Sequence, residues 1–160
     1  MKDELFEEIN RVKKDMMVSF TKYSISGDEE QNDEAVLNSV ILSWLESVKN
    51  ADDLRKKYHA FQKMSLFIQK SYLFDFVDSI LDDKNPDQIK QAIRLYHTML
   101  ENEEYNALAS SCGYRLPGEF GEEQYYLDGS LQSKVRFYHS FYERINKIYD
   151  DLLRKGAFYR

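Results

Sequence analysis

The sequence predicts an all-α protein built from a few long helices. Apolar side chains recur every three or four residues along most of the 160 residues, which is the spacing of one face of an α-helix. Only two Pro and six Gly interrupt the chain, fewer than many short strands and turns would require. Charged residues make up 31% of the chain, as is typical of helices with solvated faces. We expect about five helices in an up-and-down bundle, resembling a four-helix bundle, as a single domain over residues 1–160.

The first two predicted helices lie on either side of an acidic turn. Residues 3–23 and 33–49 are predicted helices, and residues 24–32, which contain Gly27, are the predicted turn. The apolar positions are Leu5, Ile9, Val12, Met16, Phe20 and Tyr23 in the first helix and Leu37, Val40, Ile41, Trp44, Leu45 and Val48 in the second. The turn carries an exposed acidic cluster of Asp28, Glu29 and Glu30.

The third helix is predicted to begin after Asn50 and to continue to about Asp82. The Asn50 side chain can accept a hydrogen bond from the backbone amide of Asp53, as helix N-caps do. Residues 64–81 are apolar on nearly every side, so this segment is expected either at the centre of the bundle or against a second copy of the chain.

The fourth helix has the clearest start in the chain. Asn85 is a good N-cap, Pro86 has no amide to lose at the first helical position, and Gln88 can reach back to the cap. Its apolar positions are Ile89, Ile93, Tyr96, Leu100 and Ala107.

Residues 109–127 lack a helical period and are predicted to form one long irregular loop. Connections of this length are usually functional or disordered. Acidic and aromatic side chains alternate here and would suit a protein partner; the partner-binding candidates are Tyr114, Glu119, Phe120, Glu122, Glu123, Tyr125 and Tyr126. A lid that closes one end of the bundle is the alternative interpretation.

The fifth helix begins near residue 128 or 130 and has the most regular pattern. Its apolar positions alternate by four and three, over about three heptads: Leu131, Val135, Tyr138, Tyr142, Ile145, Tyr149 and Leu152. Gly156 is placed where a helix commonly ends. This seam is a second candidate surface for homodimerisation or larger self-assembly.

The net charge of −6 is distributed unevenly. Residues from 132 onward carry seven basic and three acidic side chains, and the rest of the chain carries 15 basic and 25 acidic ones. The acidic balance argues against nucleic acid as a direct ligand. Carboxylates can instead take the place of phosphates on a basic protein surface, and Asp28, Glu29 and Glu30 are candidates for this role.

No segment is long and apolar enough to span a membrane, and the acidic N-terminal residues do not resemble a signal peptide. With Cys112 as the one cysteine, the chain is predicted to be cytoplasmic.

Cys112 is also a candidate nucleophile, and Glu103 is a candidate carboxylate with a perturbed pKa on the apolar stripe of the fourth helix. No phosphate-binding glycine loop or nucleophile elbow is present, and no cofactor is predicted.

All three histidines directly follow a tyrosine, in the pairs Tyr58-His59, Tyr96-His97 and Tyr138-His139. Each Tyr lies on an apolar stripe, so each His is rotated by about 100° to the edge of that stripe. A carboxylate follows two of the histidines one turn later, which gives a candidate metal site of His97, Glu101, His139 and Glu143. Arg94 and Arg136 oppose this site, because they occupy the positions where helical di-iron proteins have Glu.

The segment Arg55-Lys56-Lys57-Tyr58-His59 resembles small helical ribonucleases of the HEPN type, which place an Arg and a His a few residues apart on one helix. The resemblance covers five residues and implies Arg55 and His59 as a nuclease pair. The longer gap and the polar residue after Arg that the family shows are absent.

From the sequence we therefore expect a non-enzymatic acidic helical protein that inhibits, regulates or adapts a protein partner, in the manner of immunity or phage anti-defence proteins. The alternatives are a helical enzyme, with the metal site or the nuclease pair above, and a self-assembling structural protein.

Overall fold

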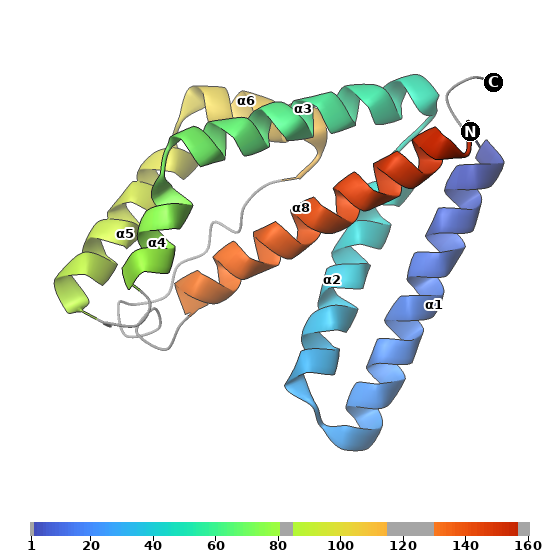
Figure 1. Ribbon diagram of the computed structural model, residues 1–160, viewed down its shortest axis with the longest axis horizontal. Coiled ribbons are helices and arrows are strands. Elements are labelled where there is room, and N and C mark those ends of the chain that lie inside the picture. The colour runs from blue at the N-terminus through green and yellow to red at the C-terminus, as the bar shows by residue number, and fades with distance from the viewer. Residues whose placement is uncertain (1, 81–84, 115–129, 157–160) are drawn as a thin grey trace. The chain divides into compact units, whose positions relative to one another are not determined.

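The computed structural model describes residues 2–80, 85–114 and 130–156, and nearly all of these are helical (Figure 1). The helices are α1 (Lys2–Ser26), α2 (Glu29–Glu46), α3 (Ala51–Lys70), α4 (Leu73–Ile80), α5 (Pro86–Leu100), α6 (Glu103–Cys112) and α8 (Ser130–Arg154). Within the described ranges there is no β-strand, so the predicted all-α class is confirmed. None of these helices is apolar over enough length to cross a bilayer.

The chain forms two compact units. The first consists of Met1–Arg55 with Ser140–Arg160, and the second of Lys56–His139. The boundary between them falls within α3 and within α8. The single domain expected from the sequence stays a prediction, and each unit is described by itself below.

The turn between the first two helices is shorter than predicted. α1 continues to Ser26 and α2 begins at Glu29, so most of residues 24–32 are helical. Gly27 adopts a positive φ of 68°, and the Asp28 side chain accepts a hydrogen bond of 3.0 Å from the Glu30 amide. A glycine in the left-handed region followed at once by an N-cap lets α1 and α2 pack as an antiparallel pair in the first unit.

The third helix does not continue to Asp82, as we had predicted. α3 ends at Lys70, and a break at Ser71 and Tyr72 separates it from α4. The Ser71 hydroxyl donates to the Ile68 carbonyl oxygen at 2.6 Å and accepts from the Leu73 amide at 3.3 Å. One hydroxyl thus serves both helix ends, which turns α4 so that Leu73 and Phe74 are buried.

Tyr72 at this break adopts a φ of 57°, although its side chain is 72% exposed. The left-handed conformation costs a non-glycine residue about 1–2 kcal/mol, and little packing offsets that cost here. We expect Tyr72→Gly to raise the free energy of unfolding by about 0.5–1 kcal/mol, after allowance for the greater entropy of glycine in the unfolded chain. Urea denaturation followed by circular dichroism measures this change. Gly27→Ala is the converse control and should lower stability, because its added methyl group meets open space and only the backbone is strained.

The fourth helix is also shorter than predicted, and the irregular segment begins later. α5 ends at Leu100, and Asn102 caps α6 by accepting a hydrogen bond of 3.1 Å from the Tyr105 amide. α6 then runs to Cys112 and is closed by Gly113 at φ 76°. Residues 109–112 of the predicted loop are therefore helical, and its residues 115–127 lie outside the described part of the chain.

The predicted caps at Asn50 and Asn85 are confirmed. Asn50 accepts from the Asp53 amide at 2.8 Å, and Asn85 accepts from the Asp87 amide at 3.0 Å. The seam of the fifth predicted helix is confirmed at four positions, where α8 buries Val135, Tyr138, Ile145 and Leu152. Tyr142 and Tyr149 of the same seam are half-buried.

Each unit has its own core. In the first unit, α1, α2 and α8 contribute apolar side chains: Leu5, Val12, Leu37, Ile41, Trp44, Leu45, Ile145, Ile148 and Leu152. In the second unit the core is rich in aromatic and sulfur-containing side chains: Tyr58, Phe61, Met64, Phe74, Tyr96, Met99, Tyr105, Cys112, Tyr114 and Tyr138.

Candidate functional site

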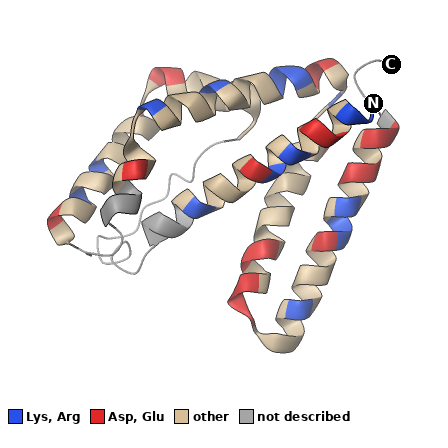
Figure 2. Ribbon diagram, viewed as in Figure 1, with Lys and Arg blue, Asp and Glu red and all other residues tan. Residues whose placement is uncertain are grey.

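The most distinctive surface of the first unit is the start of α2. Along its 18 residues α2 contains no Lys or Arg, whereas Glu29, Glu30, Asp33 and Glu34 are all exposed (Figure 2). Glu29 and Glu30 lie in the first turn, where the helix dipole favours negative charge. The fold therefore tolerates this concentration of carboxylates, although only Asp28 is required as a cap.

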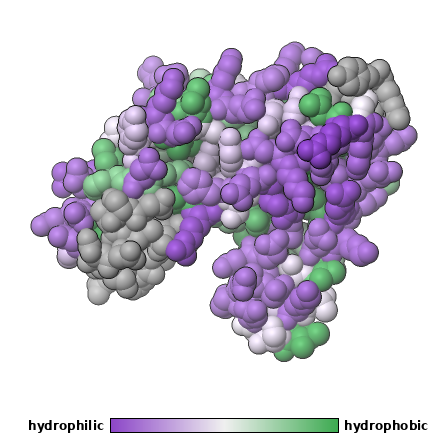
Figure 3. Space-filling view, viewed as in Figure 1, coloured by the Kyte–Doolittle hydropathy of each residue, from purple (hydrophilic) through white to green (hydrophobic). Residues whose placement is uncertain are grey.

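Apolar side chains accompany these carboxylates. Ile25, in the last turn of α1, is 84% exposed, and Val36 on α2 is also exposed. Figure 3 shows apolar surface at this end of the α1–α2 pair, beside hydrophilic surface. We call Ile25, Asp28, Glu29, Glu30 and Asp33 the acidic tip. The sequence prediction that Asp28, Glu29 and Glu30 are exposed is confirmed.

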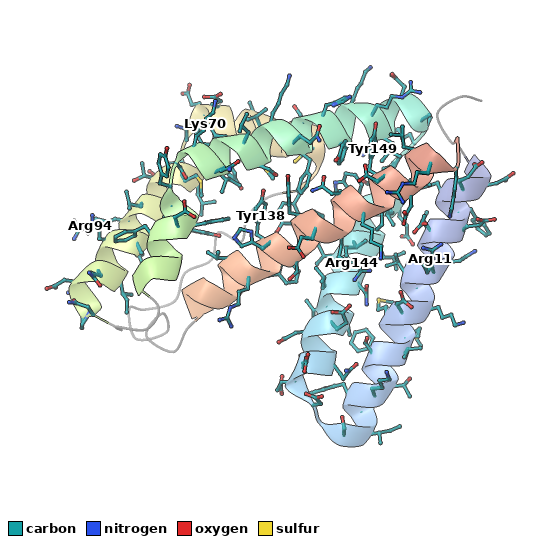
Figure 4. The ribbon with its side chains drawn as sticks, in the orientation of Figure 1. Arg11, Lys70, Arg94, Tyr138, Arg144 and Tyr149 are labelled. Atoms are coloured by element: carbon teal, nitrogen blue, oxygen red, sulfur yellow. The ribbon has the colours of Figure 1, made fainter. Side chains whose placement is uncertain are left out.

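Two polar contacts join α8 and the residue that follows it to α2 and α1 of the same unit, and sequence reasoning missed both. Arg144 of α8 donates to Glu34 at 3.2 Å and to the Asn38 side-chain oxygen at 2.9 Å (Figure 4). Glu8 of α1, almost fully buried, pairs with Arg11 at 3.3 Å and with Lys155 at 3.4 Å. Glu8 lies three residues after Leu5 and four before Val12, so its position on the buried face was the available signal.

The Tyr–His pairs are arranged as predicted, with the tyrosines buried and the histidines exposed. The imidazole of His139 lies against the ring of Phe74, with centroids 5.5 Å apart in an edge-to-face arrangement. His59 similarly lies beside the ring of Tyr58, at a centroid distance of 6.3 Å. These imidazoles therefore flank aromatic core residues at the surface of the second unit.

The structure does not gather the predicted metal ligands. Among the described residues, no group of three or more His, Cys, Asp or Glu side chains is placed to hold a metal ion. The fourth predicted helix was expected to continue past Glu101 to Ala107, but His97 lies in the last turn of α5 and Glu101 is its C-cap. His139 and Glu143 are exposed on α8.

The nuclease pair is placed on α3, where Arg55 is half-buried and His59 is exposed. Arg55 acts on Tyr149 of α8, in the same unit: burial raises the pKa of the Tyr149 hydroxyl, and the Arg55 charge partly lowers it again. This electrostatic interaction gives Arg55 a structural environment that the five-residue resemblance does not predict.

Cys112 and Tyr114 belong to the core of the second unit. The Cys112 sulfur lies 3.8 Å from the Met64 sulfur and 3.4 Å from the carbonyl oxygens of Ala109 and Tyr114. Burial raises the pKa of the Cys112 thiol, which disfavours the thiolate that a nucleophile requires.

Tyr114 was a partner-binding candidate, but it is buried, with its ring 6.3 Å from Phe61 in an edge-to-face arrangement. Burial raises the pKa of its hydroxyl well above the ordinary value, and the nearby Tyr105 and Tyr138 hydroxyls add to the shift. Tyr114 was a candidate because it lies in the predicted loop of residues 109–127, where no helical period indicates burial.

The remaining candidates fall into two groups. Glu103 lies in the exposed first turn of α6 and not on a buried stripe, because α6 is a separate helix. The other loop candidates lie outside the described residues: Glu119, Phe120, Glu122, Glu123, Tyr125 and Tyr126.

The chain matches no protein family model, no curated protein and no solved structure.

Proposed function

We propose that this chain is a non-enzymatic binding protein that docks its acidic tip onto a basic surface of a protein partner. The observation that carries the proposal is the combination, at one end of α1 and α2, of exposed carboxylates with an apolar side chain that is 84% exposed. Clustered carboxylates steer a basic partner towards this surface, and Ile25 supplies apolar area that a solvated acidic face lacks.

The partner surface that fits best is one that otherwise binds phosphate groups. Carboxylates spaced along a helix can satisfy Lys and Arg side chains that normally contact a nucleic-acid backbone. Such binding would make the protein an inhibitor or regulator of its partner, and would depend strongly on salt. A polyanion such as heparin or DNA should then compete with the protein for the partner.

The test is capture of partners on immobilised protein at low and high salt, comparing wild type with Glu29→Gln/Glu30→Gln/Asp33→Asn. Asp28 and Glu34 are left in place, because Asp28 caps α2 and Glu34 pairs with Arg144. We expect wild type to retain a partner at low salt, and the triple variant to bind that partner at least tenfold more weakly, since three exposed charges are removed.

Glu103→Gln/Glu104→Gln is the matched control, because these carboxylates also lie exposed in the first turn of a helix. It should bind the same partner as wild type does. A partner that the triple variant and wild type retain equally would contradict the assignment of the acidic tip.

A further inference from the structure

α1 has a second apolar face that the first unit does not cover. Its inner face buries Leu5, Glu8 and Val12, whereas Phe6 is 63% exposed, Met17 is 59% exposed and Phe20 is 39% exposed. An exposed phenylalanine costs solubility and offers apolar area for contact, so three large apolar side chains on one outward face of a helix require an explanation.

The spacing of these residues is that of a coiled-coil seam. Phe6, Asn10, Lys13, Met17 and Phe20 follow one another by four, three, four and three residues. We call these five residues the outer seam. The sequence pattern did not reveal it, because Phe20 was assigned to the inner stripe and Phe6 and Met17 to neither.

In an antiparallel pair of outer seams, the four layers formed by Phe6, Asn10, Lys13 and Met17 match apolar and polar residues separately, whereas Phe20 lies at the end of the seam opposite the partner's Asp3. When Phe6 faces the partner's Met17, the next layer pairs Asn10 with the partner's Lys13, and both layers recur on the other side of the twofold axis. The half-buried Ile9 then faces the partner's Met16 beside the seam. Asn10 offers an amide oxygen to the Lys13 ammonium group, which also reaches Glu46 of its own α2 at 3.8 Å.

Charge selects this orientation. Glu7 and Lys14 are exposed, lie one heptad apart and border the same edge of the outer seam, so each Glu7 faces the partner's Lys14. A parallel, in-register pair would instead place Lys13 directly opposite the partner's Lys13 within the seam.

From this match of apolar layers and charges, we propose that the chain forms a homodimer through antiparallel pairing of α1 along the outer seam. The acidic tips lie beyond Phe20 and stay outside the paired segment, so the dimer presents two of them. The dimer goes beyond the proposed function and does not depend on it, since the outer seam and the acidic tip have no residue in common.

Light scattering of the full chain, coupled to gel filtration over a range of concentrations, tests the proposal. We expect wild type to approach twice the monomer mass of 19.1 kDa as its concentration rises. Phe6→Ser/Met17→Ser removes the apolar layers and should weaken dimerisation at least 100-fold, whereas Ile25→Ser, an exposed apolar residue outside the seam, should not change it.

The charge swap tests the orientation. Glu7→Lys alone and Lys14→Glu alone should each weaken dimerisation about tenfold, because each places like charges opposite one another at two symmetric sites. The double variant Glu7→Lys/Lys14→Glu restores opposite charges and should dimerise as wild type does. A mass of 19.1 kDa at every concentration would overturn the proposal, as would a dimer that survives Phe6→Ser/Met17→Ser or a charge swap that fails to restore it.

Discussion

Tyr138→Ala is expected to lower the free energy of unfolding by about 3–5 kcal/mol, the largest effect that we predict for a single substitution. Tyr138 is 3% exposed, and its ring lies 5.3 Å from that of Phe74, 6.1 Å from that of Tyr114 and 6.5 Å from that of Phe61. Removing the ring leaves a cavity that three aromatic neighbours cannot close without shifting. Urea denaturation followed by circular dichroism measures the loss.

Tyr138→Phe separates the ring from its hydroxyl. The Tyr138 hydroxyl donates to the Ser65 side-chain oxygen at 2.5 Å, and losing this hydrogen bond should cost only about 1 kcal/mol, because the ring contacts remain. Ser65→Ala should cost a similar amount, and combining it with Tyr138→Phe should add little, since both remove the same bond. Equal losses for Tyr138→Phe and Tyr138→Ala would show that packing of the ring is not what stabilises the second unit.

The long periodic features of this fold could be predicted from the sequence. Tyr96 and Tyr138 recur with the helical period of their neighbours, so their burial followed from spacing alone. Asn50 and Asn85 are N-caps whose effect is local, and a local signal does not depend on the rest of the fold.

The helix breaks could not be predicted in the same way. Nothing at Ser71 and Tyr72 breaks a helix by propensity, since neither is Gly or Pro. The break is stabilised by two hydrogen bonds of the Ser71 side chain and by the burial of Phe74 against Tyr138, which depends on a segment more than 60 residues away. Asn102 caps α6, but the apolar period of residues 89–107 runs across it and predicts one continuous helix.

The residues of the candidate site, too, could be predicted only where their environment is set by the local sequence. Asp28, Glu29 and Glu30 are exposed as expected, because acidic residues beside a glycine turn are solvated whatever the tertiary structure. The outer seam was missed because the apolar period assigned Ile9 and Phe20 to the inner face of α1. The structure buries Glu8 and Ser19 on that face instead. The spacing of Glu8 from Leu5 and Val12 places it on the buried face, but one of the cations that pair with it there, Lys155, lies at the other end of the chain and could not be inferred from local sequence.

A second buried polar residue, Asn38, makes Arg144→Met the other substitution with a large expected effect. Asn38 is 1% exposed, its side-chain oxygen accepts from Arg144, and its side-chain nitrogen has no hydrogen-bond partner among the described residues. Arg144→Met leaves both polar atoms of Asn38 buried without a partner, so we expect a loss of about 2–3 kcal/mol in the free energy of unfolding. Arg154→Met, an exposed arginine on the same helix, is the control and should change stability by less than about 0.5 kcal/mol.

The substitution Asn38→Leu distinguishes two sources of the stability lost in Arg144→Met. One is the lost attraction between Arg144 and Glu34, and the other is the buried Asn38 amide left without a hydrogen-bond partner. Arg144 is partly exposed and keeps Glu34 as a partner, so Asn38→Leu alone should cost little, since it replaces a half-satisfied amide with an apolar group of similar volume. If the loss in Arg144→Met comes from the stranded Asn38, adding Asn38→Leu should recover most of it, with a coupling energy of about 1–2 kcal/mol. A double variant as unstable as Arg144→Met would mean that the attraction between Arg144 and Glu34 holds α8 on α2. That result would be unexpected for a pair whose carboxylate is about half exposed.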